Sequence, residues 1–211
     1  MLKIKKFIFN PFQENTYLVW DFESMEAMVI DPGCYNENEE SQIIEFIIKE
    51  NLILKYLINT HCHIDHVLGN AFIKNKFNCT FFAPELDMPL LNNLMSQSEL
   101  FGFKAAKSPT PDKFITEDLK LNLGENYFTF LFTPGHTAGE FSILFDNFCF
   151  SGDVLFLDGI GRTDLPGGDY NTLINSIIKK LLVLPDNTEV FPGHGDKTTI
   201  GYEKLNNPFL N

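Results

Sequence analysis

The chain has 211 residues, 44% of them hydrophobic, which suffices for one domain with a large buried core. The formal net charge of −12 argues against a nucleic-acid partner, because such binding needs lysine and arginine to neutralise phosphates. The N-terminal residues lack the apolar stretch of a secretory signal, and no apolar run is long enough for an ordinary membrane-spanning helix. We therefore expect one cytoplasmic domain over residues 1–211 that binds neither nucleic acid nor membrane; the sequence does not indicate its oligomeric state.

In the first half of the chain, short apolar runs predict five strands. They span residues 3–9, 16–20, 27–30, 52–58 and 78–82. A helix is expected at 38–50, with acidic residues at its start, where the helix dipole favours them. The apolar stripe of this helix, which we expect to be buried, consists of Ile43, Ile44, Ile47 and Ile48. Further helices are expected to begin within 67–72 and to span 84–94.

Residues 96–116 show little periodicity and contain Pro109 and Pro111. A loop of this length in a compact domain is usually functional or mobile. Residues 96–116 are therefore a candidate lid over the functional site.

The second half repeats the pattern of strands followed by a helix. Its expected strands span residues 120–123, 127–132, 140–145, 148–150 and 189–191. A helix at 172–184 has Asp169 or Asn171 as a cap and Pro185 as its end. Its continuous apolar stripe consists of Leu173, Ile174, Ile177, Ile178, Leu181 and Leu182. Two sets of strands, each with its own helix, predict an α/β (α+β) fold in which two sheets pack face to face between outer helices, a four-layer αββα sandwich.

A dense group of metal-binding side chains lies between the strand at 52–58 and the helix that follows. His61, His63, Asp65 and His66 fall within six positions. Because alternate residues on an extended backbone point the same way, His61 and His63 should face one point. Asp65 and His66, in the turn, can face a second point nearby. Imidazole and carboxylate ligands suit zinc, iron or manganese rather than calcium or copper(I).

The other two histidines of the five, His136 and His194, each stand in a Pro-Gly-His turn after an apolar run. Asp153 directly follows the apolar run 148–150. A lone histidine or aspartate in such a place is more often ordinary turn chemistry. Because every histidine of the chain lies at a strand end, we favour a shared metal site over unrelated turn residues.

The order His61-x-His63-x-Asp65-His66, then His136, Asp153 and His194, is similar to that of the metallo-β-lactamase superfamily. This resemblance spans nearly the whole chain. Two further segments, residues 159–168 and 192–210, resemble the small glyoxalase II-like hydrolases of that superfamily.

The resemblance implies a centre of two divalent metal ions, with zinc as the first choice and iron or manganese as alternatives. It implies His61, His63 and His136 as ligands of one ion, Asp65, His66 and His194 as ligands of the other, and Asp153 as a bridge. It also implies that Asp31 orients a metal-bound histidine. An ordinary turn role before Pro32 is equally open for Asp31.

Two such ions lower the pKa of a shared water to about 7, so that hydroxide forms at neutral pH. The resemblance therefore implies a metallo-hydrolase that cleaves a thioester or ester, with S-lactoylglutathione or a related acyl thioester as candidates. Asp65 could in addition orient the water or carry a proton. Full-length glyoxalase II enzymes continue into a helical domain that binds glutathione, which we do not expect here, so a different acyl thioester or an ester is an alternative substrate.

Arg162, the single arginine of the sequence, lies in a glycine-rich loop shortly after Asp153. Its guanidinium could bind a substrate carboxylate such as one on glutathione. Alternatively, it pairs with Asp164 or Asp158 and shapes the loop. The sequence leaves both roles open.

Three other functions remain to be distinguished. Residues 59–63 and 161–164 also resemble persulfide dioxygenases, which would hold one iron on His61, His136 and Asp153. A non-enzymatic metal-binding module is another alternative. A secreted β-lactamase is disfavoured by the missing signal peptide and by the Arg-Thr-Asp loop at 162–164, which is foreign to that group.

Overall fold

The computed structural model describes residues 1–103 and 105–210, and the first half of the chain forms one sheet with helices beside it. The sheet has the strand order β1-β2-β3-β4-β5-β6. Its strands are β1 (Leu2–Phe9), β2 (Glu14–Asp21), β3 (Glu26–Ile30), β4 (Ile53–Ile58), β5 (Thr80–Ala83) and β6 (Lys113–Phe114). The helices are α1 (Glu37–Lys49), α2 (Ile64–Val67), α3 (Asn70–Phe77), the short η1 (Glu85–Asp87), α4 (Met88–Asn92) and α5 (Leu94–Phe101).

The second half forms a sheet with the order β14-β13-β10-β9-β8-β7 and a small β11-β12 hairpin. The strands are β7 (Lys120–Leu123), β8 (Asn126–Phe132), β9 (Phe141–Leu144), β10 (Phe148–Gly152), β11 (Leu155–Phe156), β12 (Gly159–Ile160), β13 (Glu189–Pro192) and β14 (Thr198–Thr199). The helices are α6 (Tyr170–Ser176), continued by η2 (Ile177–Leu181), and α7 (Ile200–Asn206). The side chain of Asp169 caps α6 by accepting the main-chain N–H of Thr172, as expected.

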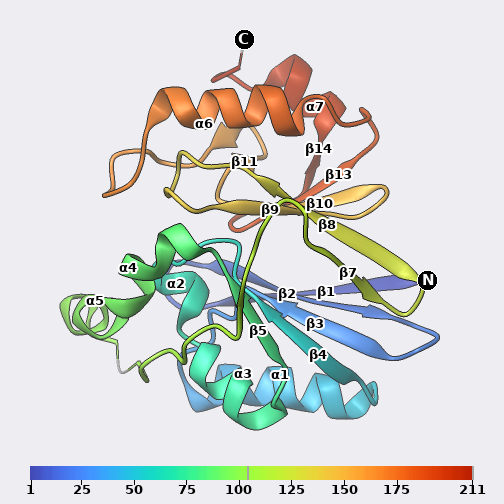
Figure 1. The fold of residues 1–211 in the computed structure, drawn as a ribbon, viewed down its shortest axis with the longest axis vertical. Coiled ribbons are helices and arrows are strands. Elements are labelled where there is room, and N and C mark those ends of the chain that lie inside the picture. Colours follow the sequence, from blue (N-terminus) through green and yellow to red (C-terminus); the bar gives the residue numbers. More distant parts are fainter. Residues whose placement is uncertain (104, 211) are drawn as a thin grey trace.

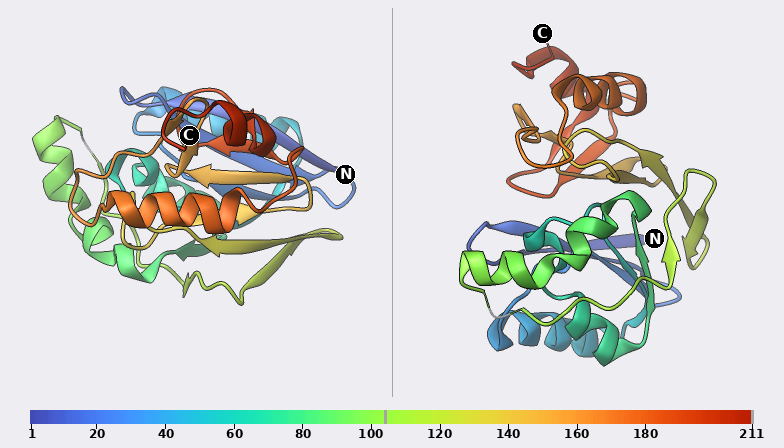
Figure 2. Two further views of the ribbon diagram at one scale, coloured as in Figure 1. Left: turned by 90° about the horizontal axis from the view of Figure 1, so that it is seen from above. Right: turned by 60° about the vertical axis from the view of Figure 1, so that its left-hand side comes forward.

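The two sheets pack face to face in a single domain, with α1 and α3 outside one sheet and α6 and α7 outside the other (Figure 1). Figure 2, in its right-hand view, shows the halves stacked, with the blue-to-green first half below the yellow-to-red second half. Buried aromatic residues of both sheets, among them Phe82, Phe128 and Phe150, form the core between them. The predicted four-layer αββα fold is confirmed.

The predicted burial of the helix stripes was wrong at two positions. Ile43 and Ile47 of α1 are buried as expected, but Ile48, in the last turn, is 66% exposed. Ile178 of the second long helix is also exposed. Two adjacent isoleucines lie about 100° apart around an α-helix, and somewhat less in the wider π-helical turn η2, so only one of each pair faces the sheet.

The expectation of a loop throughout residues 96–116 was also wrong. Helix α5 continues to Phe101, and strand β6 joins the edge of the first sheet beside β5. Phe101 and Phe103 pack against Phe12, with ring centroids 5.5 and 5.7 Å apart. Lys104, within this segment, lies outside the described residues. A role as a lid stays a prediction.

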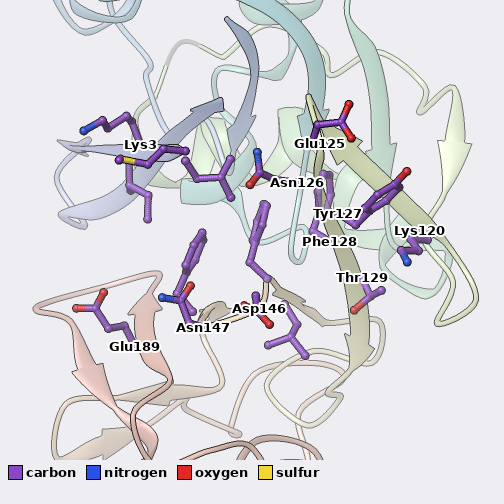
Figure 3. A pocket seen from close by; sticks show the side chains of 16 residues that line it. Lys3, Lys120, Glu125, Asn126, Tyr127, Phe128, Thr129, Asp146, Asn147 and Glu189 are labelled. Atoms are coloured by element: carbon purple, nitrogen blue, oxygen red, sulfur yellow. The ribbon is translucent and has the colours of Figure 1, made fainter. Parts of the chain in front are cut away.

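A cavity of about 930 Å³ opens at one end of the sandwich (Figure 3). Its walls come from the starts of β1, β8 and β13 and from the turn between β9 and β10. The lining includes Phe128 together with charged residues such as Lys3, Glu125 and Asp146. None of the predicted metal ligands lies in this wall. Within residues 1–103 and 105–210, no helix combines the length and the apolar character needed to cross a membrane.

Candidate metal centre

The predicted ligands follow the ends of strands from both sheets. His61 and His63 follow β4, His136 follows β8, Asp153 follows β10, and His194 follows β13. Strands β3 and β4 are parallel, as are β10 and β13. The C-terminal ends of the two strands in each pair therefore lie at the same edge of their sheet. The strand ends therefore gather the side chains at the edge opposite the cavity of Figure 3.

One predicted detail of this loop was wrong. Asp65 and His66 lie inside α2, which begins at Ile64, and not in a turn before a helix at Val67. The main-chain N–H of His66 donates to the carbonyl of His63, so the helix begins directly at the motif. The helix places the ring of His66 beside that of His61, with ring centroids 4.1 Å apart.

His61, His63 and His136 form the first ligand group. One nitrogen of each lies within 4.8 Å of the others, an arrangement that could hold a metal ion. Nδ1 of His63 and Nε2 of His136 are 2.8 Å apart. The other nitrogen of His136, Nδ1, is 2.8 Å from the main-chain oxygen of Arg162, which fixes the ring orientation.

Asp65, His66 and His194 form a second group with the same spacing. Nε2 of His194 lies 3.2 Å from Oδ2 of Asp65. Nε2 of His66 is 3.7 Å from the same carboxylate oxygen. The residues come from both halves of the chain, so the second group is completed only when the two sheets pack together.

Asp153 lies between the two groups. Its Oδ2 is 3.5 Å from Nε2 of His136 in the first group and 3.5 Å from Nε2 of His194 in the second. Its Oδ1 is 3.5 Å from Nε2 of His66. This is the position that a carboxylate shared by two ions requires.

Three buried atoms of the cluster lack a hydrogen-bond partner within the described part of the chain: Nε2 of His61, Nε2 of His66 and Oδ1 of Asp153. Buried polar atoms in folded proteins are normally satisfied, and unpaired ones need an explanation. All three are good donors to a divalent cation. The cluster therefore fits metal ions better than it fits a purely structural network.

Electrostatic interactions within the cluster also favour a cation. Burial, together with the neighbouring histidines, holds the pKa of His61 well below its usual value, and the same causes lower that of His63 to about 4. Burial also acts to lower the pKa of His66, but the carboxylates of Asp65 and Asp153 outweigh it and raise the pKa well above the usual value. Burial therefore keeps His61 and His63 as neutral imidazoles, the form that binds a metal ion, and the carboxylates of the second group attract positive charge, which a cation would supply.

Asp31 lies behind this centre and accepts hydrogen bonds from the main-chain N–H and the hydroxyl of Thr60, at 2.7 and 2.6 Å. Its Oδ2 is also 3.2 Å from Nδ1 of His66. These contacts match the orienting role that the resemblance implies.

Glu140 is a further residue beside the centre that the sequence does not single out. It is fully buried, accepts the main-chain N–H of Asp153 at 2.7 Å, and lies 3.4 Å from Nδ1 of His61. In the sequence, Glu140 is a single acidic residue directly before an apolar run. Many strands begin in this way, so the pattern does not indicate a functional role.

The sequence profile of the metallo-beta-lactamase superfamily matches residues 9–194, which include every predicted ligand. The chain belongs to this superfamily. Hydroxyacylglutathione hydrolase GloC of Haemophilus influenzae is 43% identical over 206 residues, which cover 95% of this chain and 94% of that protein. The chain is accordingly a glyoxalase II-like metallo-hydrolase.

Two solved structures support the same fold. The structure described as BLEG-1 B3 metallo-β-lactamase matches with a TM-score of 0.89 and 34% identity, over 99% of this chain and 100% of that one. The structure of TTHA1623 in a di-iron-bound form matches with a TM-score of 0.86 and 36% identity, and the match covers 98% of this chain and 100% of that one. Two irons in that protein show that this fold accommodates a pair of ions.

The side chain of Arg162 lies outside both ligand groups of this superfamily member. It is 60% exposed and makes two hydrogen bonds of 2.7 Å to the carboxylate of Asp164. This pairing agrees with the loop-shaping alternative. Binding of a substrate carboxylate by Arg162 stays a prediction.

Proposed function

We propose that this protein hydrolyses the thioester of a hydroxyacylglutathione at a centre of two divalent metal ions. The observation that carries the proposal is the position of Asp153, whose carboxylate lies 3.5 Å from a histidine nitrogen on either side. The ions would be held by His61, His63 and His136 on one side and by Asp65, His66 and His194 on the other, with Asp153 between them. Zinc is our first choice for both positions, followed by iron or manganese.

Divalent ions bound there would supply a Lewis acid for the thioester carbonyl and would lower the pKa of a bound water. The proposed ligands differ in exposure: the buried ones form the floor of the site, and the partly exposed ones form its mouth. His61 and His66 are fully buried, whereas the side chain of Asp65 is 13% exposed and that of His194 is 27% exposed. The substrate carbonyl would therefore approach from the side of Asp65 and His194.

Asp65 is the residue we assign to proton transfer. Its carboxylate is close to His194, 3.2 Å from Nε2, and it is more exposed than Asp153. A partly exposed carboxylate at the mouth can orient a water toward the carbonyl and accept its proton. This role comes in addition to its proposed place among the ligands.

The glutathione part of the proposed substrate is supported by the Haemophilus influenzae relative, which carries the name hydroxyacylglutathione hydrolase and is matched over 94% of its length. We therefore place S-lactoylglutathione ahead of other acyl thioesters and esters. Arg162, the single arginine, is the group we propose for a glutathione carboxylate, and Asp164 would hold it in position.

The proposal is tested with a panel of substrates and one protein sample of known metal content. The kcat/KM for S-lactoylglutathione should be about tenfold or more above that for the lactoyl thioester of a short neutral thiol. The second substrate lacks the groups that would contact the protein through glutathione. The Asp153→Ala variant is the inactive control. Equal rates on the two thioesters would contradict glutathione as the carrier.

Two further measurements on the same sample address the other functions. Faster turnover of a chromogenic cephalosporin than of any thioester would replace the proposal with β-lactam hydrolysis, the activity in the name of one structural neighbour. Iron-dependent oxygen consumption with glutathione persulfide, without thioester hydrolysis, would establish the dioxygenase. A metal-loaded protein inert toward all of these would be a binding module.

A further inference from the structure

A second buried carboxylate, Asp87, contacts the loops that carry the first ligand group. Asp87 ends the short helix η1 and is 1% exposed. Its Oδ2 accepts the main-chain N–H of Cys62 at 3.1 Å and the hydroxyl of Thr137 at 2.8 Å. Its Oδ1 accepts the main-chain N–H of Gly139 at 2.8 Å.

These donors lie next to the first ligand group in the sequence. Cys62 stands between His61 and His63, and Thr137 directly follows His136. His63 and His136 are 73 residues apart in the sequence, and their loops follow strands of two different sheets. One carboxylate thus joins the two loops at the positions adjacent to all three rings.

An ordinary helix-capping role does not account for this residue. Asp87 occupies the N-cap position of α4, but its side chain accepts no hydrogen bond from that helix. The described partners of its carboxylate belong to the two ligand loops. Burial raises the pKa of Asp87, and the hydrogen bonds from Thr137, Cys62 and Gly139 act against that rise, so these donors stabilise the ionised form.

Gly139 shows how closely the contact is packed. A Cβ atom at this position would lie 2.7 Å from Oδ1 of Asp87 and 2.9 Å from its main-chain nitrogen. Both distances are shorter than a carbon atom tolerates, so any side chain at position 139 would push Asp87 away. The glycine therefore allows the carboxylate to reach the second loop.

We propose that Asp87 is a positioning residue that sets the separation of His61, His63 and His136 and thereby the affinity of the first metal position. This inference rests on the ligand assignment of the proposed function. Asp31 has the corresponding place behind the second group, where it contacts His66. The first group would then have two buried carboxylates behind it, Glu140 at 3.4 Å from Nδ1 of His61 and Asp87 at the two ligand loops.

The Asp87→Asn variant tests the proposal with little change in shape. Asparagine keeps one acceptor oxygen, and its NH₂ group would face a main-chain N–H of Cys62 or Gly139, so one of these bonds is lost. We expect the affinity of the first position to fall about ten- to a hundredfold, the usual effect of removing an outer partner. The second position should change little. Thr137→Val, which removes only the hydroxyl, should act in the same direction and less strongly.

The measurement is a cobalt(II) titration of the metal-depleted protein, followed by absorption and by competition with a chelator. The absorption of cobalt at the first position should change in Asp87→Asn, because the angles between the nitrogens change. Asp21→Asn is the matched control, since Asp21 is also buried and also joins both halves, through Asn126, but at the cavity end. It should leave cobalt binding and absorption unchanged.

The outcomes separate the inference from the proposed function. If the unmodified protein binds no cobalt at a nitrogen-rich position, the ligand assignment itself fails. If it binds two ions and Asp87→Asn and Thr137→Val keep its affinities and absorption, the positioning role is wrong. Equal weakening of both positions in Asp87→Asn and in Asp21→Asn would show general destabilisation and would also overturn it.

Discussion

The two ends of the sandwich bury polar groups in opposite ways. At the cavity end, the carboxylate of Asp21 accepts bonds from the terminal ammonium of Met1, the main-chain N–H of Ser24 and the amide of Asn126. At the histidine end, buried atoms of His61, His66 and Asp153 are without hydrogen-bond partners in the described chain. The first arrangement is complete in itself, whereas the second needs a bound cation.

The comparison shows that unsatisfied polar atoms identify the site better than empty volume does. The cavity of about 930 Å³ is lined in part by Asn126, whose side-chain amide is already paired with Asp21. The proposed metal ligands lie outside the wall of that cavity and converge from four strand ends. Substitutions at the histidine end should therefore change metal binding, and substitutions at the cavity end should change only stability.

The largest effect is expected for Asp153→Ala. The carboxylate lies between both ligand groups, so its loss removes a contact from each proposed ion. Metal content should fall by half or more, and S-lactoylglutathione hydrolysis should be lost, while the circular dichroism spectrum is retained. Elemental analysis and an activity assay measure both. Full activity with full metal content would exclude a bridging role.

A smaller effect is expected for Asp31→Asn, because this residue acts through His66 and Thr60. Asparagine tolerates the positive φ of 48° at this position, so the backbone should be retained. Metal affinity of the second position should fall about ten- to a hundredfold in chelator competition. Asp112→Asn is the control, since Asp112 accepts the main-chain N–H of Phe81 away from the ligands. Equal losses in both variants would argue for a general effect.

Arg162→Ala should have an effect of several-fold, confined to KM. Loss of a charge-assisted contact should raise KM for an anionic thioester more than for a neutral ester. Asp164→Asn separates the two roles of the pair, because Asp164 holds the guanidinium but would not itself bind an anion. If Asp164→Asn and Arg162→Ala raise KM equally for both substrates, Arg162 only shapes the loop.

The smallest effect on function is expected for Asp21→Asn at the cavity end. Burial acts to raise the pKa of Asp21, but the bonds from Ser24 and the Met1 ammonium lower it to about 2. A depressed pKa contributes stability above the unfolded value of about 3.9, and this contribution is lost as the pH falls through 2. The difference in unfolding free energy between the two proteins should be greatest above pH 5 and vanish toward pH 2. A constant difference would contradict the ionised pair.

The ends of the sandwich also differ in what the sequence reveals. The strands of the core could be predicted because their apolar runs are short and bounded by turn residues. The clustering of the histidines could be predicted because all five follow such runs. Asp87 and Glu140 could not be found, since each is a single carboxylate whose partners lie far away in the sequence. Only the packing of the two sheets brings Asp87 to Thr137.

Helix α5 was missed for a different reason. Leu94 and Ser98 are buried, but Leu100 is 82% exposed, so the helix has no continuous apolar stripe. The helix is held by Leu94, which is buried in the core at its start, and by Phe101 at its end, which packs against Phe12 from the beginning of the chain. A helix held at its two ends in this way has no periodic signal in its own sequence.

The most direct test of the account is a stepwise return of zinc or iron to the metal-depleted protein, with bound metal and S-lactoylglutathione hydrolysis measured on the same samples. The two-ion centre predicts that activity rises to its maximum as the bound metal approaches two ions per chain. Maximal hydrolysis with one bound ion would contradict the bridging position of Asp153. One bound iron with no hydrolysis at any metal content would contradict the proposed thioesterase.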